Sequence, residues 1–125
     1  MSQQLADFER SRNAGEDMTA KKYYIVQQAA DGDIEVGEGA TDLLVGVLQN
    51  KPNTDEPALY RFAGTTKVIV AGAIAIGDWI TSDSAGKAVA TTTDKDTVIA
   101  RALEASAADL DVIEIQLAIF TLSVA

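Results

Sequence analysis

The chain has 125 residues, of which 47% are hydrophobic and 23% charged, a composition typical of a single globular domain. It contains neither Cys nor His, which excludes disulfides, thiol nucleophiles, a histidine base and most zinc sites. The formal net charge of −9 disfavours nucleic acids and anionic membranes as partners. The most apolar stretch, residues 68–80, is too short to cross a bilayer, so no membrane partner is expected.

Residues 1–22 differ in charge from the rest of the chain. They hold four acidic and four basic residues, whereas residues 23–125 hold 15 acidic and six basic residues. The segment is too polar for a signal peptide, and only Leu5 and Phe8 indicate one face of a helical turn, which the following RNAGED sequence ends. We therefore expect an extended or partly ordered N-terminal arm over residues 1–22, followed by a β domain over residues 23–125.

From Tyr23 onward, short apolar runs alternate with Gly, Asp, Asn, Ser and Pro, which is typical of an all-β domain. In the last run, Val112 and Glu114 lie on one face and Ile113 and Ile115 on the other, as in a half-buried antiparallel strand. The expected strands are Lys22–Gln28, Asp33–Val36, Leu43–Gln49, Ala58–Ala63, Thr66–Ala71, Trp79–Ser82, Ala88–Thr92, Val98–Glu104 and Val112–Thr121.

One short helix is an alternative to a strand in the second half of the chain. The sequence TVIARALEASAADL, residues 97–110, contains good helix formers, and its apolar positions also fit a period of 3.6 residues. It opens with β-branched residues, however, and ends in small residues typical of a turn. We predict a strand here and keep the helix as the alternative.

A shift of the chain by 55 residues superposes its two parts as a weak repeat. The turn glycines Gly32 and Gly86 then fall one position apart. The pattern predicts pseudo-repeats over about residues 23–62 and 78–117, which would form a small β-barrel or a pair of packed β-sheets. Coincidence within a regular β pattern is the alternative. The matched pairs are Tyr24 with Trp79, Ile25 with Ile80, Ile34 with Val89, Leu44 with Ile99, Tyr60 with Ile115 and Phe62 with Leu117.

The stretch GDWITSDSAGKAV, residues 77–89, resembles the loop of a nucleotide-binding site. A phosphate-binding loop needs four residues between its glycines and a Ser or Thr after the Lys. Here eight residues separate Gly77 from Gly86, and Ala88 follows Lys87. Because Asp, Ser and Gly favour turns, we predict that this stretch is a hairpin turn and not a site.

No catalytic, cofactor-binding or metal-binding set is predicted, and therefore no enzyme activity. Gly37 and Gly39 lack the third glycine of a dinucleotide fingerprint, and the segment 31–33 lacks the remainder of a calcium loop. Acidic pairs such as Asp94 and Asp96 fall in turn-like segments, where solvated loop ends are the simpler interpretation.

Three aromatic residues are candidates for contact with a partner. Trp79, the single tryptophan, begins a strand and suits a glycan-stacking platform or an interface anchor, with packing at the rim of the core as the alternative. Tyr23 and Tyr24 lie where the arm joins the β domain, so they either hold the arm down or face a neighbouring subunit.

The order of features in the second half resembles that of the capsid cement, or decoration, proteins of tailed phages. The resemblance covers about residues 23–120 and lies in the spacing of segments, without a catalytic motif. Ala100 departs from the glycine that is usual before the x-A-L-E segment, which puts only a local bulge in doubt. The segments that carry it are Ile76–Ile80, Ser84–Val89, Ile99–Glu104 and Asp111–Leu117.

The resemblance implies a small structural protein that assembles as a homotrimer on the exterior of the virion capsid after synthesis in the host cytoplasm. Its partners would be the major capsid protein and other copies of itself, with no cofactor and no nucleic acid. A glycan-binding or surface-binding β module that uses Trp79 is the alternative function. The residues expected to contact the capsid or a neighbouring subunit are Leu5, Phe8, Arg10, Arg12, Tyr23, Tyr24 and Trp79.

Overall fold

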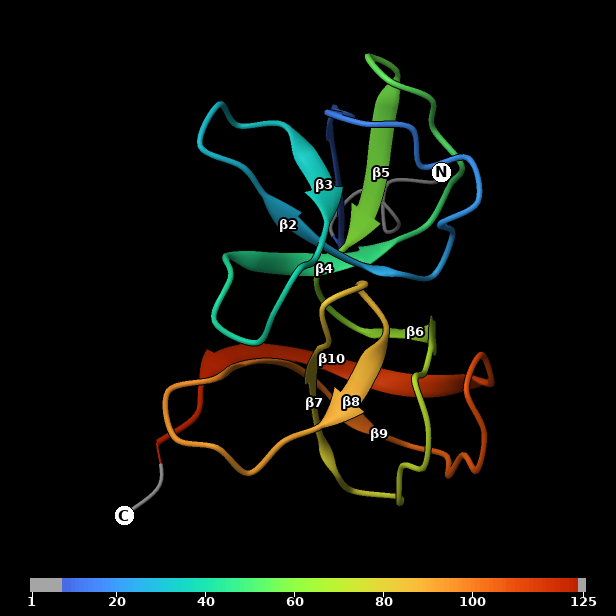
Figure 1. The fold of residues 1–125 in the computed structure, drawn as a ribbon, viewed down its shortest axis with the longest axis vertical. Helices are drawn as coiled ribbons and strands as arrows, with labels where there is room; N and C mark the ends of the chain where they lie inside the picture. Colours follow the sequence, from blue (N-terminus) through green and yellow to red (C-terminus); the bar gives the residue numbers. More distant parts are fainter. Residues whose placement is uncertain (1–7, 124–125) are drawn as a thin grey trace.

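Each half of the chain forms one five-stranded antiparallel sheet, and Figure 1 shows the first half above the second. The structure is a computed structural model that describes residues 8–123. The strand order is β1-β5-β4-β2-β3 in the first sheet and β6-β10-β9-β7-β8 in the second. The strands are β1 (Glu9–Asn13), β2 (Ile25–Gln28), β3 (Ile34–Val36), β4 (Leu44–Leu48), β5 (Pro57–Arg61), β6 (Thr65–Ile69), β7 (Trp79–Ser82), β8 (Ala88–Ala90), β9 (Thr97–Ala102) and β10 (Val112–Thr121).

The expected all-β fold with two packed sheets is confirmed, and the sheets do not close into a barrel. Residues 8–123 contain no helix, so none there is long and apolar enough to span a membrane. The strand predicted within residues 97–110 is confirmed, because Thr97–Ala102 forms β9 between β7 and β10. The apolar residues of this segment pair within the sheet, which overrides its helix propensity.

Strand β1 was not predicted, and it lies within the segment expected to be an arm. This strand pairs antiparallel with β5, from Glu9 opposite Arg61 to Asn13 opposite Pro57. Its sequence, ERSRN, has no buried side chain and so shows no apolar alternation. Ala14 and Met18, which follow it, are fully buried. Residues 9–18 are therefore part of the first sheet and of its core.

The two sheets share their register as well as their order. Val26 is opposite Val36 in the first sheet, and Ile80 is opposite Ala90 in the second, so Val26 corresponds to Ile80 at an offset of 54 residues. The pairing of Ile25 with Ile80 expected from the uniform shift of 55 is thus wrong by one residue. A slip of one residue in a strand moves every side chain to the opposite face of the sheet.

The offset differs between strands because the connecting loops differ in length. Leu48 is opposite Tyr60 and Ala102 is opposite Ile115, so Tyr60 corresponds to Ile115 at an offset of 55, as expected. Glu9 opposite Arg61 matches Thr65 opposite Gln116, so β1 corresponds to β6 at an offset of 56. The repeat therefore includes the N-terminal strand.

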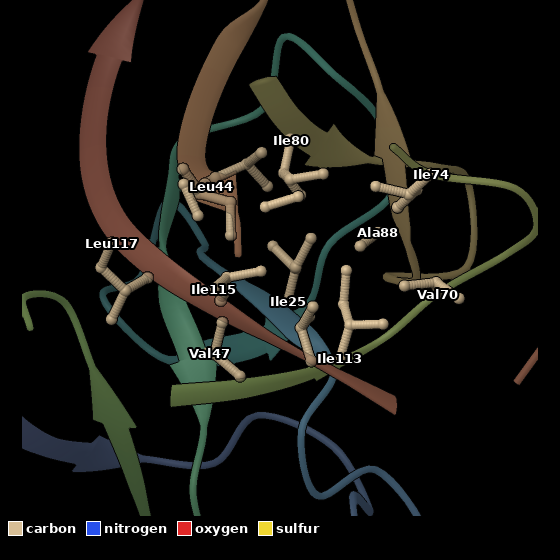
Figure 2. Close-up of a cluster of buried hydrophobic side chains, with 14 residues drawn as sticks. Ile25, Leu44, Val47, Val70, Ile74, Ile80, Ala88, Ile113, Ile115 and Leu117 are labelled. Carbon is tan, nitrogen blue, oxygen red and sulfur yellow. The ribbon is translucent and has the colours of Figure 1, made fainter. Parts of the chain in front are cut away.

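Each half has its own apolar core, and each of the seven buried residues of the first core corresponds to a residue of the second. The second core also receives residues from the first sheet, and Figure 2 shows Ile25 and Val47 beside Ile113 and Ile115. Central strands β2 and β4 thus bury side chains on both faces of the first sheet. The corresponding pairs are Ala14 and Val70, Met18 and Ile74, Val26 and Ile80, Ile34 and Ala88, Leu48 and Ala102, Ala58 and Ile113, and Tyr60 and Ile115.

The stretch at residues 77–89 contains a hairpin turn, as predicted. The carboxylate of Asp83 accepts hydrogen bonds from the backbone N–H groups of Ala85 at 2.8 Å and Lys87 at 2.9 Å. Gly86 has a φ of 81°, in the left-handed region that favours glycine. Its carbonyl accepts a hydrogen bond of 2.8 Å from the N–H of Ile25, so the turn is held against the first half of the chain.

Candidate functional site

The outer face of the second sheet carries exposed apolar side chains around Trp79. The ring of Phe120 meets the half-buried indole edge to face at 5.1 Å between centroids, and the guanidinium of Arg101 lies 5.3 Å from the indole centroid. A shallow hollow of about 480 Å³ lies on this surface. We call it the Trp79 face, defined by Ile76, Trp79, Arg101, Leu103, Gln116 and Phe120.

Three large apolar side chains are exposed on the Trp79 face. Ile76 is 71% exposed, Leu103 39% and Phe120 37%. Exposed apolar side chains that gather on one surface mark interaction sites, whereas single ones are normal. Tryptophan and arginine, both present here, are enriched among the residues that dominate the energy of protein interfaces.

A second apolar surface lies mainly on the first half of the chain and includes Ile119 from β10 of the second half. It is a shallow hollow of about 300 Å³, in which the guanidinium of Arg10 lies 4.8 Å from the ring centroid of Phe62. Phe8, which is 43% exposed, lies next to it, because its carbonyl accepts a hydrogen bond of 3.0 Å from the N–H of Phe62. We call it the Phe62 hollow, defined by Arg10, Leu44, Val45, Tyr60, Phe62 and Ile119.

Of the two predicted tyrosines, Tyr23 joins the first half of the chain to the second through the backbone. The N–H of Tyr23 donates to the carbonyl of Leu48 at 2.8 Å, and its carbonyl accepts from the N–H of Ile69 in β6 at 3.0 Å. Tyr23 has a φ of 71°, which turns the chain into β2. The ammonium groups of the preceding lysines lie over both tyrosine rings, so each ring has one face covered.

Acidic residues gather at the β2–β3 hairpin and the loop before it. Burial, followed by the charges of Glu16, Asp31, Glu38 and Asp33, raises the pKa of Glu35 above its ordinary value. In the part of the chain that the structure describes, no group of three or more Asp or Glu side chains is arranged to hold a metal ion. Each buried side-chain nitrogen or oxygen atom within this part has a hydrogen-bond partner.

The structure distributes the predicted contact residues over several places. Phe8 and Arg10 lie at the Phe62 hollow, and Trp79 lies on the outer face of the second sheet. Arg12 belongs to β1 but donates from Nε to the carbonyl of Gly32 at 2.7 Å, which ties β1 to the β2–β3 turn. Leu5 lies outside the described residues.

Sequence reasoning missed several residues of the two apolar surfaces, namely Phe62, Arg101, Leu103, Ile119 and Phe120. A signal was present at the end of β10. Up to Leu117 this strand alternates between buried and exposed residues, but Ala118, Ile119 and Phe120 are all exposed. The register of β10 against β9 shifts between Leu117 and Phe120, which ends the alternation.

Comparisons with known proteins identify one family and one fold. A family model described as phage cement protein matches residues 13–117. No curated protein matches the sequence. Among solved structures, the N base of the head fiber gp8.5 of bacteriophage phi29 is similar with a TM-score of 0.65 and 19% sequence identity, over 92% of this chain and 97% of that chain. At this identity the likeness shows a common fold.

Proposed function

Because the chain belongs to the phage cement protein family, and is thus a capsid-associated structural protein, we propose that it binds the outer surface of the capsid and stabilises the shell. Its partners in this proposal are the major capsid protein and other copies of itself, most simply in a homotrimer. It acts through contact area and not through catalysis. The residues that we propose to contact the capsid or a neighbouring copy are the seven named from the sequence: Leu5, Phe8, Arg10, Arg12, Tyr23, Tyr24 and Trp79.

The observation that carries this proposal is the pair of exposed apolar surfaces on a chain whose two cores are already complete. The side chains of both cores are already buried within the chain, including Leu44 and Tyr60, which also line the Phe62 hollow. Surfaces of this kind lower their free energy when a partner covers them. A weak contact by one copy becomes strong when many copies bind a repeating lattice.

The charge of the chain supports a position on the outside of the shell. The net charge of −9 repels the phosphate groups of packaged DNA, whereas it helps to keep an exposed surface soluble. Five of the acidic residues, namely Glu16, Asp31, Asp33, Glu35 and Glu38, lie close enough at the β2–β3 hairpin to interact electrostatically.

The proposal is tested by co-sedimentation with capsids from the same phage that lack the protein. We expect saturable binding, and we expect limited proteolysis of the intact particles to cleave the bound protein, because an exterior position leaves it accessible. No binding to expanded or unexpanded capsids would contradict the proposal. Titration with sugars tests the alternative at the same time, since a glycan stacked on Trp79 would change its fluorescence.

A further inference from the structure

The contact between the two halves of the chain shows how one such half docks onto another. The outer face of the first sheet contributes Ile25, Leu44 and Val47 to the core of the second half. All three are at most 2% exposed. At the edge of this contact, Gln49 and Thr66 exchange side-chain hydrogen bonds of 3.0 and 3.3 Å. The receiving residues of the second half include Ile99, Ile115 and Leu117.

The Trp79 face is the counterpart, in the second half, of this buried outer face. Ile25 is opposite Val47 in the first sheet, and Trp79 is opposite Arg101 in the second, so Trp79 corresponds to Ile25 and Arg101 to Val47. At the same offset of 54, Leu103 corresponds to Gln49. The counterparts of Ile25, Val47 and Gln49 therefore lie on the outer face of the second sheet, whereas Val98, the counterpart of Leu44, is buried.

Arg10, Val45, Tyr60 and Phe62 of the Phe62 hollow are the first-half counterparts of the receiving surface. The strand registers give the offset between the two halves for each strand. At these offsets, the second-half residues that receive the first half correspond to first-half residues that line the hollow. Thr66, which bonds to Gln49, corresponds to Arg10 in β1. The matching pairs are Ile99 and Val45, Ile115 and Tyr60, and Leu117 and Phe62.

From this correspondence we propose that copies of the chain associate head to tail, with the Trp79 face of one copy docked on the Phe62 hollow of the next. The contact repeats between chains the packing that already joins the two halves within a chain. The apolar lining of the hollow, which includes Val45, Phe62 and Ile119, suits the apolar Leu103, whereas the guanidinium of Arg10 already lies over one face of the Phe62 ring.

A head-to-tail contact uses two different patches, so it closes into a ring or continues as a filament. A ring of a few copies is the form in which it would supply the oligomer of the proposed function. The inference rests on the self-association in that proposal, but it does not depend on which part of the ring faces the capsid.

Single lysines placed on the two patches test the proposal in solution, without capsids. Leu103→Lys blocks the Trp79 face and Ile119→Lys blocks the Phe62 hollow, since these side chains are 39% and 40% exposed. Leu110→Lys is the matched control, because Leu110 is exposed and lies outside both surfaces. Sedimentation velocity gives the size distribution of each protein, and thermal unfolding shows that each variant is folded.

We expect the native protein and the Leu110→Lys variant to assemble alike, and each of the other two variants to dissociate at least about tenfold more readily, because a buried unpaired charge is costly. An equimolar mixture of the Leu103→Lys and Ile119→Lys variants should form one-to-one dimers, since each supplies the patch that the other lacks. A mixture that stays monomeric, or a single variant that assembles like the native protein, would overturn the inference.

A cross-linking experiment gives an independent reading. Because the chain has no Cys, the variants Leu103→Cys and Ile119→Cys each carry one reactive thiol. A short bismaleimide should join the two variants in a mixture and leave Leu110→Cys unlinked. A native protein that is monomeric at all concentrations would also overturn the inference, whereas co-sedimentation of that monomer with capsids would leave the binding part of the proposed function intact.

Discussion

The two halves of the molecule have the same strand order and register, yet they bury their sheets differently. Strands β2 and β4 of the first half are covered on both faces, whereas their counterparts β7 and β9 expose the Trp79 face. The difference lies in side chains at equivalent positions, because Ile25 and Val47 correspond to Trp79 and Arg101. A common backbone therefore supports either a buried or an exposed sheet face, and the side chains decide which.

The edge strands β1 and β6 also occupy equivalent positions but differ in burial. Arg12 of β1 is exposed and corresponds to Val68 of β6, which is fully buried beneath the docked first half. The first half has no such neighbour at this edge among the described residues, so its edge strand stays polar. This explains why one of the two equivalent strands had an apolar pattern and the other did not.

The largest expected effect comes from exchanging the residues that distinguish the two sheets. Val47→Arg places a charge in the core between the halves and should cost more than about 4 kcal/mol, enough to unfold a domain of ordinary stability. The reverse change at the equivalent position, Arg101→Val, should alter the free energy of unfolding by less than about 0.5 kcal/mol. Urea unfolding measures both free-energy changes, and equal changes would contradict the difference in burial between the two sheets.

The next effect tests whether the N-terminal segment closes the first core as its counterpart closes the second. Met18 is fully buried and corresponds to Ile74, which is 4% exposed. Met18→Ala and Ile74→Ala should each lower the free energy of unfolding by about 2–5 kcal/mol. A cost below about 0.5 kcal/mol for Met18→Ala in the same denaturation assay would show that residues 1–22 act as a separate arm.

The two hairpin glycines give a smaller and more local comparison. Gly32 and Gly86 both have positive φ, so alanine should cost about 1 kcal/mol at either position. A Cβ at Gly86 would also collide with the side chain of Val36 and crowd the carbonyl of Ile25, whereas the tightest contact of one at Gly32 is with the far end of the Arg12 side chain. Gly86→Ala should therefore lower the thermal midpoint further, by the equivalent of about 1–3 kcal/mol.

The smallest effect concerns the acidic end of the first half. The pKa of Glu35 is raised in the folded protein, so its ionisation destabilises the fold as pH rises above about 4.5, the ordinary value for this group. Glu35→Gln should thus stabilise the protein at pH 7 by less than about 1 kcal/mol, because solvent screens a group so near the surface. The gain in stability should vanish near pH 3, where Glu35 is protonated. A gain that persists at pH 3 would show that the ionisation of Glu35 is not its cause.

The class of fold followed from the sequence because strand alternation and turn residues act locally. The strands from Ile25 onward were predicted to within a few residues, and so was the turn at Gly86. Strand β1 was missed because a polar edge strand carries no apolar period. The repeat was aligned one residue out of register in β2, although Gly32 and Gly86 already indicated the correct offset of 54.

The candidate surfaces were less predictable because they combine residues that are distant in the sequence. Trp79 stood out as the single tryptophan, but its neighbours Arg101 and Phe120 come from other strands. The Phe62 hollow joins β1, β4, β5 and the end of β10, and no local pattern indicates that combination. Only the correspondence between the halves shows that the hollow and the Trp79 face are the two sides of one kind of contact.

The most direct test of the cement function is the temperature at which DNA-filled capsids lacking the protein release their DNA. Addition of the native protein to saturation should raise that temperature, because bound copies add contacts across the shell. The Leu103→Lys variant should raise it less at the same total concentration. A release temperature that does not change when the native protein is bound would contradict a stabilising role.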